Sequence, residues 1–137
     1  MKLIGRRLAR AGAALCAAAA LVLSTTPAAT AATPRNGVCE DGEFCLYYYT
    51  ELRGSVSDFT TSVLNYGSSQ PSCYDFKGPG DGQGLCVKNN ARSAWNRRGD
   101  HVWVFFNSNH SGDFDVVGSG SMRDLVNTFD NNASHGL

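Results

Sequence analysis

Four cysteines in this sequence have a spacing that predicts disulfide chemistry. They are Cys39, Cys45, Cys73 and Cys86, whereas the fifth cysteine, Cys16, lies in an apolar stretch near the N-terminus. An even set of cysteines in a short exported chain favours disulfides, and the absence of a Cys-x-x-Cys spacing argues against zinc. Three pairings are possible, and we favour Cys39–Cys45 with Cys73–Cys86, because each closes a short segment rich in glycine and polar residues.

Two segments rich in asparagine and serine could supply oxygen ligands to a cation. They are residues 89–93, Asn-Asn-Ala-Arg-Ser, and residues 130–134, Asp-Asn-Asn-Ala-Ser. Amide, carboxylate and hydroxyl oxygens are the hard ligands that Ca²⁺ prefers. The same residue types also form turns through side-chain to backbone hydrogen bonds, so the residues themselves leave both roles open.

Catalytic chemistry has little support in the sequence. No His-Glu-x-x-His, Gly-x-Ser-x-Gly, phosphate-binding loop or dinucleotide fingerprint is present. The histidines His101, His110 and His135 are scattered, and the acids near them, such as Asp100 and Asp113, lie in polar stretches typical of solvated surface. We therefore expect that the protein is not an enzyme.

The N-terminus has the organisation of a secretory signal peptide. An apolar run of 13 residues, 11–23, is too short for a mature membrane anchor, and Ala29-Thr30-Ala31 is a small-x-small cleavage site. A basic start precedes the apolar run and consists of Lys2, Arg6, Arg7 and Arg10. The pattern predicts a leader at 1–31, a single mature domain at 32–137, export to the extracellular space, and no membrane contact after cleavage.

The charge of the predicted mature domain excludes a nucleic-acid footprint. The whole chain is formally neutral, with 12 Lys and Arg against 12 Asp and Glu. Loss of the four leader cations leaves 8 against 12, and a mildly acidic domain has no attraction for phosphate backbones. The only adjacent basic pair, Arg97-Arg98, is typical of a solvated turn. We expect a monomer that does not bind nucleic acid.

One stretch of sequence occurs twice at a spacing of 58 residues. Residues 46–54 correspond to residues 104–112, and each copy runs from an apolar, aromatic segment through polar residues to a glycine, Gly54 or Gly112. A repeat of this kind indicates one supersecondary unit used twice. The first unit is longer by 17 residues, and the glycine-rich segment 77–84 is the obvious place for part of the insertion.

The chain between these signals reads as short strands separated by turns. No window of ten residues has a helical period, and glycine is frequent, which favours an all-β sandwich or Greek-key barrel. The expected strands cover residues 44–49, 55–59, 72–76, 85–88, 101–107 and 113–117.

Aromatic residues are abundant, with 7 Phe, 5 Tyr and 2 Trp. A small sandwich has few core positions, and aromatic side chains fill them with the most area per residue. We therefore expect a core that contains Trp95, Trp103, Phe105 and Phe114. An exposed strip that includes Tyr47 or Tyr49 would instead stack on sugars.

The two aromatic-to-glycine turns, which span Tyr47 to Gly54 and Phe105 to Gly112, resemble the folded hairpins of βγ-crystallin Greek-key motifs. The two Asn-rich segments resemble the calcium motif of the same superfamily and keep five of its six positions. Ala94 and His135 stand where the last serine of the motif would be. We expect that no cofactor is required, and the resemblance makes Ca²⁺ the candidate ion, with Asn90, Ser93, Asn131 and Ser134 as its ligands.

A more specific resemblance covers nearly all of the predicted mature domain. Residues 39–47, with Cys39, Gly42 and Cys45-Leu46-Tyr47, the block 89–96 and the turn 105–112 are similar to the secreted actinobacterial peptidase-inhibitor family typified by the streptomycete metalloproteinase inhibitor. This resemblance implies a disulfide-stabilised βγ-crystallin-like Greek-key sandwich built from two tandem motifs. It also implies inhibition of an extracellular protease, with metalloproteinases as the targets.

The segment between Cys73 and Cys86 is the candidate inhibitory loop. A protease inhibitor needs a pre-organised loop that loses little entropy on docking. Tyr74 and Phe76 would enter a protease pocket and Asp75 would approach a metal. The alternative is a flexible insertion with Tyr74 and Phe76 in the core. A second functional reading is a calcium-stabilised extracellular binding or killer-toxin-like module without inhibitory activity.

Overall fold

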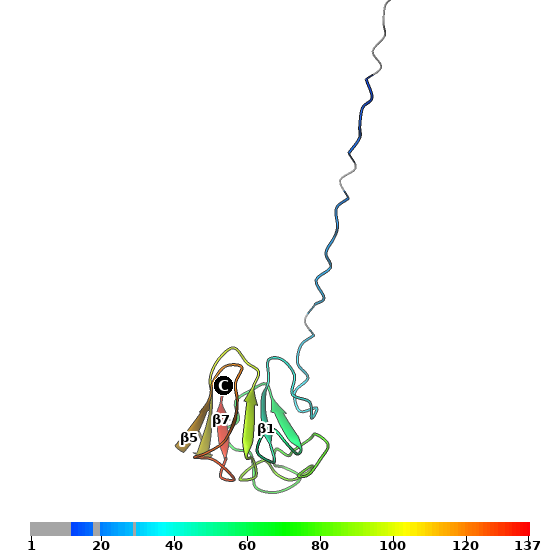
Figure 1. Ribbon diagram of the computed structural model, residues 1–137. Helices are drawn as coiled ribbons and strands as arrows, with labels where there is room; N and C mark the ends of the chain where they lie inside the picture. Colours follow the sequence, from blue (N-terminus) through cyan, green and yellow to red (C-terminus); the bar gives the residue numbers. More distant parts are fainter. Residues whose placement is uncertain (1–11, 18–19, 29) are drawn as a thin grey trace, which may run out of the picture.

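The structure is a computed structural model, and it describes residues 12–17, 20–28 and 30–137 (Figure 1). The predicted leader's basic start, Lys2, Arg6, Arg7 and Arg10, lies outside the described residues, as does Ala29 of the predicted cleavage site. Within the described part, no helix is long and apolar enough to cross a membrane. The leader remains a prediction.

The described part of the chain folds into two antiparallel sheets without a helix, which confirms the all-β prediction. One sheet has the strand order β2-β1-β3-β6, and the other has the order β5-β4-β7. The strand bounds are β1 Phe44–Tyr47, β2 Val56–Phe59, β3 Ser93–Asn96, β4 Val102–Asn107, β5 Ser111–Val117, β6 Met122–Asp124 and β7 Ser134–Gly136.

The two sequence units exchange a segment, as expected for two interlocked Greek keys. β1, β2 and β3 come from the first unit, yet β6 of the second unit completes their sheet beside β3. In return, Val63 of the first unit forms an antiparallel bridge to His135 in β7 of the second unit. Neither sheet is complete without the other unit, so the duplicated sequence folds as one body (Figure 1).

The repeated turns have the same backbone conformation in both units. Gly54 and Gly112 have φ values of 77° and 80°, which lie in the region open to glycine. In each turn two consecutive non-glycine residues also adopt a positive φ. These residues are Glu51 (57°) and Leu52 (57°), and Asn109 (61°) and His110 (53°). The 58-residue repeat is therefore a structural repeat as well.

The core lies between the sheets and is formed by alternate residues of the strands. Its buried apolar side chains include Phe44, Leu46, Phe59, Tyr66, Phe76, Val87, Val102, Val104 and Val117. The expectation that Trp103 and Phe114 fill this core is wrong, because they take the outward positions of β4 and β5 and are 40% and 46% exposed. Phe105 and Trp95 are half-buried.

The expected strands at residues 72–76 and 85–88 are reduced to a single antiparallel bridge between Asp75 and Cys86. Three of the glycines between them, Gly80, Gly82 and Gly84, adopt positive φ values of 85° to 118°. Positive φ interrupts an extended backbone, so the segment turns instead of continuing as a hairpin.

His135 is a buried polar residue at the junction of the two units. Its Nε2 donates to the Thr61 carbonyl at 2.9 Å, so its Nδ1 accepts from the Tyr66 hydroxyl at 2.8 Å. Burial lowers the pKa of His135 to about 3, and the hydrogen bond to Thr61 only partly opposes this effect. The imidazole is therefore neutral in the folded protein at any moderately acidic pH.

Stability should fall on acidification well before the carboxylates titrate. Unfolded His135 takes up a proton near pH 6.5 and folded His135 only near pH 3. Between these values the unfolded state binds more protons, so the free energy of unfolding decreases as pH falls, by up to about 1.4 kcal/mol per pH unit. Urea unfolding at several pH values between 7 and about 4.5 measures this slope.

A pair of variants isolates the imidazole from other titrating groups. His135→Gln should flatten the dependence on pH even if it lowers stability throughout, whereas His101→Gln, at an exposed position, should leave the dependence unchanged. Burial raises the pKa of Glu43, so its contribution to the pH dependence of stability has the opposite sign to that of His135. Because the parent protein and both variants contain Glu43, its contribution cancels when their slopes are compared. An unchanged slope in His135→Gln would contradict the assignment.

Candidate functional site

The structure contains the favoured cysteine pairing. In the described part, Cys39 is bonded to Cys45 and Cys73 to Cys86, with Cα–Cα distances of 6.0 and 5.6 Å. The second bond closes the segment that we call the arm, residues 73–86. The additional residues of the first unit lie between Val63 and Ser93, so the arm is the main part of what distinguishes the first unit from the second.

Backbone hydrogen bonds fix the arm along its length. The Tyr74 N–H donates to the Tyr66 carbonyl at 2.7 Å, and the Tyr74 carbonyl accepts from the Val87 N–H at 2.8 Å. The Phe76 N–H donates to the Leu85 carbonyl at 3.0 Å. With the disulfide, these bonds hold both sides of the arm against the domain. The arm is therefore attached to the domain along both sides, and of the alternative, a flexible insertion with Tyr74 and Phe76 in the core, the structure shows the buried Phe76.

Arg35 clamps the arm to the first sheet. Its Nη2 donates to the Asp75 carbonyl at 2.5 Å, and its Nη1 donates to the Ser57 hydroxyl at 2.5 Å. The guanidinium also lies over the rings of Phe59, at 4.6 Å, and Tyr74, at 5.4 Å. Burial lowers the pKa of Arg35, and the carboxylates around it oppose that shift. The sequence did not single out Arg35, because these hydrogen-bond partners lie 22 to 40 residues away.

The three predicted contact residues of the arm differ in accessibility. Tyr74 is 38% exposed. Phe76 is 1% exposed and packs edge-to-face on Tyr48 at 5.7 Å. The prediction that Phe76 reaches a protease pocket is therefore wrong for this structure, because its ring is buried in the hydrophobic core. Tyr74 is the aromatic side chain that the arm presents.

Asp75 is paired within the protein. Its carboxylate lies 2.8 Å from the Lys77 ammonium and 3.5 Å from the Arg35 guanidinium. Burial by itself would raise the pKa of Asp75, but the hydrogen bond and charge of Lys77 outweigh burial and lower the pKa. The carboxylate is ionised at neutral pH, and it would have to leave Lys77 in order to approach a metal ion on a partner.

The base of the arm meets an N-terminal strap, residues 35–41. Gly37 has a φ of 81°, and a Cβ at this position would lie 2.8 Å from the Gly78 nitrogen. A Cβ on Gly78 would lie 2.7 Å from a methyl group of Val56. Only glycine allows the strap, the arm and β2 to approach so closely.

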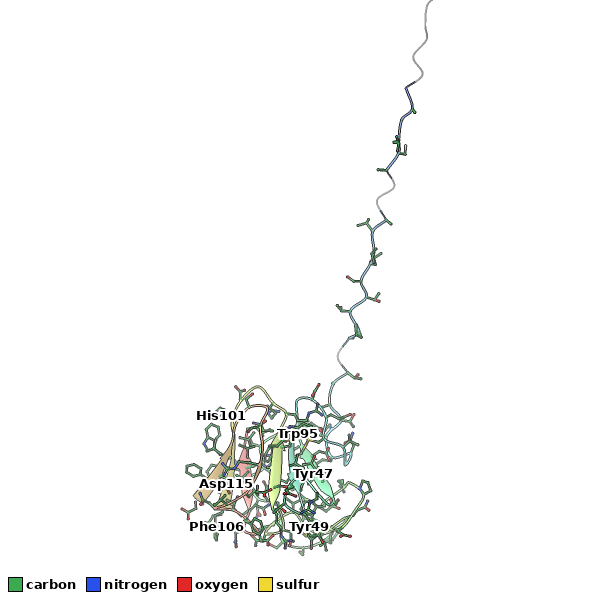
Figure 2. The ribbon with its side chains drawn as sticks, in the orientation of Figure 1. Tyr47, Tyr49, Trp95, His101, Phe106 and Asp115 are labelled. Carbon is green, nitrogen blue, oxygen red and sulfur yellow. A yellow bond between two sulfur atoms is a disulfide. The ribbon has the colours of Figure 1, made fainter. Side chains whose placement is uncertain are left out.

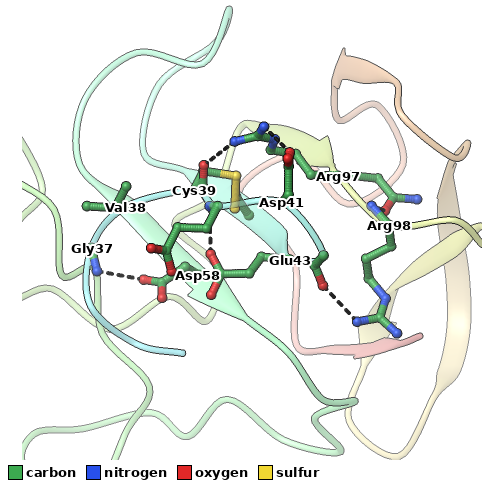
Figure 3. The surroundings of a disulfide bond; sticks show 12 residues. Gly37, Val38, Cys39, Asp41, Glu43, Asp58, Arg97 and Arg98 are labelled. Atoms are coloured by element: carbon green, nitrogen blue, oxygen red, sulfur yellow. Dashed lines mark hydrogen bonds and ion pairs between the residues drawn. A yellow bond between two sulfur atoms is a disulfide. The ribbon is translucent and has the colours of Figure 1, made fainter. Parts of the chain in front are cut away.

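The Cys39–Cys45 bond and a set of charged groups hold the strap to the first sheet (Figure 3). The Gly37 N–H donates to an Asp58 carboxylate oxygen at 2.8 Å, and Arg97 donates to the Cys39 carbonyl at 2.6 Å and pairs with Asp41. Arg97 also stacks on Trp95 at 4.6 Å. The reading of Arg97 as a solvated turn residue is therefore wrong.

The two Asn-rich segments lie side by side. Asn132 is buried, its amide oxygen accepts from the Ala91 N–H at 3.1 Å, and its amide nitrogen donates to the Val87 carbonyl at 2.9 Å. Arg92 pairs with Asp130 at 3.0 Å. These contacts join the ends of the two units directly, without requiring a cation between them.

The predicted calcium ligands Ser93 and Ser134 have equivalent structural roles. The Ser93 hydroxyl donates to the Tyr49 carbonyl at 2.6 Å and accepts from the Leu52 N–H at 3.0 Å. The Ser134 hydroxyl donates to the Asn107 carbonyl at 2.7 Å and accepts from the His110 N–H at 3.2 Å. Each serine closes the positive-φ turn of its own unit, which leaves one lone pair for a metal.

The other predicted ligands, Asn90 and Asn131, use their amide nitrogens within the protein. Asn90 donates to the Cys86 carbonyl at 2.8 Å, and Asn131 donates to the Phe129 carbonyl at 2.9 Å. Both amide oxygens therefore keep their lone pairs for another partner. Calcium binding stays a prediction.

Removing either turn serine should destabilise the fold without any metal present. In Ser93→Ala the Leu52 N–H loses its partner, and in Ser134→Ala the His110 N–H does. An unsatisfied donor of this kind costs about 1–3 kcal/mol. Urea unfolding in the presence of a chelator measures the loss. Ser111→Ala is the control, because its exposed hydroxyl donates only to Ser108, and a loss as large there would contradict the assignment.

Calcium should raise the melting temperature of the mature, oxidised protein if the Asn-rich segments bind it. Stabilisation of about 1.4 kcal/mol is expected when Ca²⁺ is at roughly ten times its dissociation constant. The double variant Asn90→Ala, Asn131→Ala should lose this response, whereas Mg²⁺ should give little response in either protein. Calorimetry without heat and an unchanged melting temperature at millimolar Ca²⁺ would reject calcium binding.

Comparisons with known proteins agree with this architecture. A solved structure from work on the evolution of the eye lens βγ-crystallin domain fold superposes with a TM-score of 0.53 at 20% identity, covering 72% of this chain and 90% of that chain. At this identity the likeness shows the fold alone. No curated protein matches the sequence. The family model of peptidase inhibitor family I36 matches residues 32–117. The chain therefore belongs to peptidase inhibitor family I36.

Proposed function

We propose that this protein is a secreted inhibitor of extracellular metalloproteinases and that the arm is the part that contacts the peptidase. Membership of peptidase inhibitor family I36 supports the inhibitory function and a protease partner. The observation that carries the proposal is the clamped arm, which presents the half-exposed ring of Tyr74 on a segment fixed by the Cys73–Cys86 bond and Arg35.

The stiffness of the arm is what suits it to inhibition. Association loses free energy for every side chain and loop that must be ordered on binding, and a segment held in one conformation beforehand avoids that cost. The arm is fixed before any partner arrives by its disulfide, its backbone bonds to Tyr66 and Val87, and the Arg35 clamp. These contacts form within the chain itself and need no partner.

The contact with the peptidase is made through side chains in this proposal. Both the N–H and the carbonyl of Tyr74 are engaged within the protein, so neither is available for pairing with an extended substrate site. The exposed ring of Tyr74 would fill an apolar pocket of the peptidase. The exposed residues 69–72, which precede Tyr74, would contact the rim of that pocket. Asp75 supports the arm through Lys77.

Export fits the covalent structure of the domain. Disulfides form and persist in oxidising compartments, and Cys39–Cys45 and Cys73–Cys86 both need such a compartment. The predicted leader at 1–31 supplies the route in this proposal.

Tyr74→Ala should weaken inhibition at least about tenfold, because an aromatic side chain in a partner's pocket contributes about 2 kcal/mol or more to binding. The free energy of unfolding should change by less than about 1.5 kcal/mol, since the ring is 38% exposed. Inhibition constants against a panel of secreted metallo- and serine peptidases, measured with the mature oxidised protein with and without Ca²⁺, give the comparison.

Leu85→Ala is the matched control, because Leu85 lies on the returning segment of the same arm, where its carbonyl accepts from the Phe76 N–H, and is 47% exposed. It should inhibit as the parent protein does. Inhibition that survives Tyr74→Ala unchanged would remove the arm from the mechanism and leave the inhibitory function standing. No inhibition of any peptidase in the panel would overturn the function itself.

A further inference from the structure

The two Asn-rich segments contact each other reciprocally. The Asn89 N–H donates to the Asn132 carbonyl at 2.8 Å, and the Asp130 N–H donates to the Ala91 carbonyl at 3.0 Å. Asn89 and Asp130 also share a positive φ, of 61° and 53°. The offset of 41 residues that relates the two segments in sequence therefore relates them in structure as well. We call residues 89–93 and 130–134 the paired segments.

Charged side chains make the paired segments unequal. Arg92 and Asp130 are their only charged residues, and the equivalent residues of the other segment are Ala133 and Asn89. The Arg92 Nε donates to both carboxylate oxygens of Asp130, at 3.0 and 3.1 Å. Of two equivalent pairs of positions, one therefore holds two opposite charges in contact, whereas the other holds only an amide and a methyl group.

Aromatic rings from both units surround the Arg92 guanidinium. It lies 5.7 Å from the ring centroids of Tyr48 and Tyr49, which follow β1, and 5.6 Å from that of Phe129, which precedes Asp130. Figure 2 shows Tyr49 at the end of the domain opposite to His101. The side chain of Arg92 is 33% exposed. Cation–π contacts and partial burial make such a charge pair stronger than one in open solvent.

The backbone of Arg92 also contacts both units. Its N–H donates to the Tyr47 carbonyl in β1 at 2.9 Å, and its carbonyl accepts from the N–H of Leu125, just after β6 of the second unit, at 2.9 Å. Backbone and side chain together fix the positive charge of Arg92 where the two units meet. The guanidinium could leave Asp130 only by giving up its contacts with the aromatic rings.

A metal ion that bridges the paired segments would find little negative charge there. The predicted calcium ligands belong to these segments, keep oxygen lone pairs, and are all uncharged: Asn90, Ser93, Asn131 and Ser134. The described part of the chain contains no group of three or more His, Cys, Asp and Glu side chains that could hold a metal ion. Asp130 is the one carboxylate of the paired segments, and Arg92 already neutralises it.

The charge of the ligands is one of the factors that set how tightly a protein site holds Ca²⁺. At the paired segments Ca²⁺ has two routes. It can bind through uncharged oxygens close to a guanidinium, where the two positive charges repel each other, or it can displace the guanidinium from Asp130 and lose the energy of that pair. Both routes cost free energy, so Arg92 opposes calcium binding in either case.

We propose that Arg92 is a built-in cation of the paired segments, which joins the two units through Asp130 in the way that a bridging metal ion would, and which competes with Ca²⁺ for this position. The protein therefore holds its two units together without a metal ion, and its affinity for Ca²⁺ is low because of one side chain. Neither the arm nor a peptidase takes part in this competition.

Arg92→Ala introduces the residue type that the second unit has at the equivalent position, Ala133. Titration calorimetry of the mature, oxidised protein with CaCl₂ should give a dissociation constant at least about tenfold lower than in the parent, because Asp130 becomes free to act as a charged ligand. In a chelator the variant should melt at a lower temperature than the parent, and Ca²⁺ should recover part of the difference. Arg92→Gln keeps an aliphatic stem beside the rings and repeats the measurement if Arg92→Ala does not fold.

Two controls separate competition from the loss of a contact or of a charge. Asp130→Asn breaks the same pair but also removes the acid, so it should lower the melting temperature without tightening calcium binding. Arg53→Ala frees Glu51 from an exposed pair, whose side chains are 66% and 73% exposed, and should change neither quantity. A gain in calcium affinity confined to the Arg92 variants supports the proposal. An affinity equal to that of the parent, a gain as large in either control, or no calcium binding by the Arg92 variants would overturn it.

Discussion

One hydrogen-bonded junction, present twice, underlies the architecture. In each unit a buried serine from the last strand is hydrogen-bonded to the turn that follows the first strand. The Ser93 hydroxyl donates to the Tyr49 carbonyl and accepts from the Leu52 N–H. The Ser134 hydroxyl donates to the Asn107 carbonyl and accepts from the His110 N–H. The turn needs consecutive residues at positive φ, a conformation that costs free energy and persists only where surrounding contacts enforce it. The serine supplies that contact, and it ties the last strand of each unit to the turn that follows the first strand of the same unit.

The two units differ in two segments, the arm and the strap, which only the first unit contains. The first unit carries the arm and the strap, each closed by its own disulfide and each pressed against the same sheet. Arg35 connects the two by donating to the arm at Asp75 and to β2 at Ser57. The result is a segment held by a disulfide and hydrogen bonds that presents one exposed aromatic ring, and such pre-organisation favours inhibition because little ordering remains to be done on docking.

The second unit has neither an arm nor a strap, and its sheet exposes aromatic side chains on its outer surface. Strand positions that lie under the strap in the first sheet are aromatic and open in the second, where Trp103 and Phe114 are exposed. Exposed apolar patches on small domains mark interaction surfaces more often than chance exposure. Duplication thus produced two similar sheets with different neighbours: the first is covered by the strap, and the second exposes Trp103 and Phe114.

The sequence alone predicted the fold class and the two units and favoured the cysteine pairing that the structure contains, because these depend on local spacing: the repeat of residues 46–54 at 104–112, the turn glycines, and short cysteine-to-cysteine segments. It misplaced Trp103, Phe114 and Phe76, because alternation along a strand does not say which face is covered. Only the tertiary structure decided that the turn serines are held by hydrogen bonds and that Arg35 clamps the arm. Those contacts join residues 22 to 44 positions apart, and a pattern read along the chain carries no information about which distant groups folding brings within hydrogen-bonding distance.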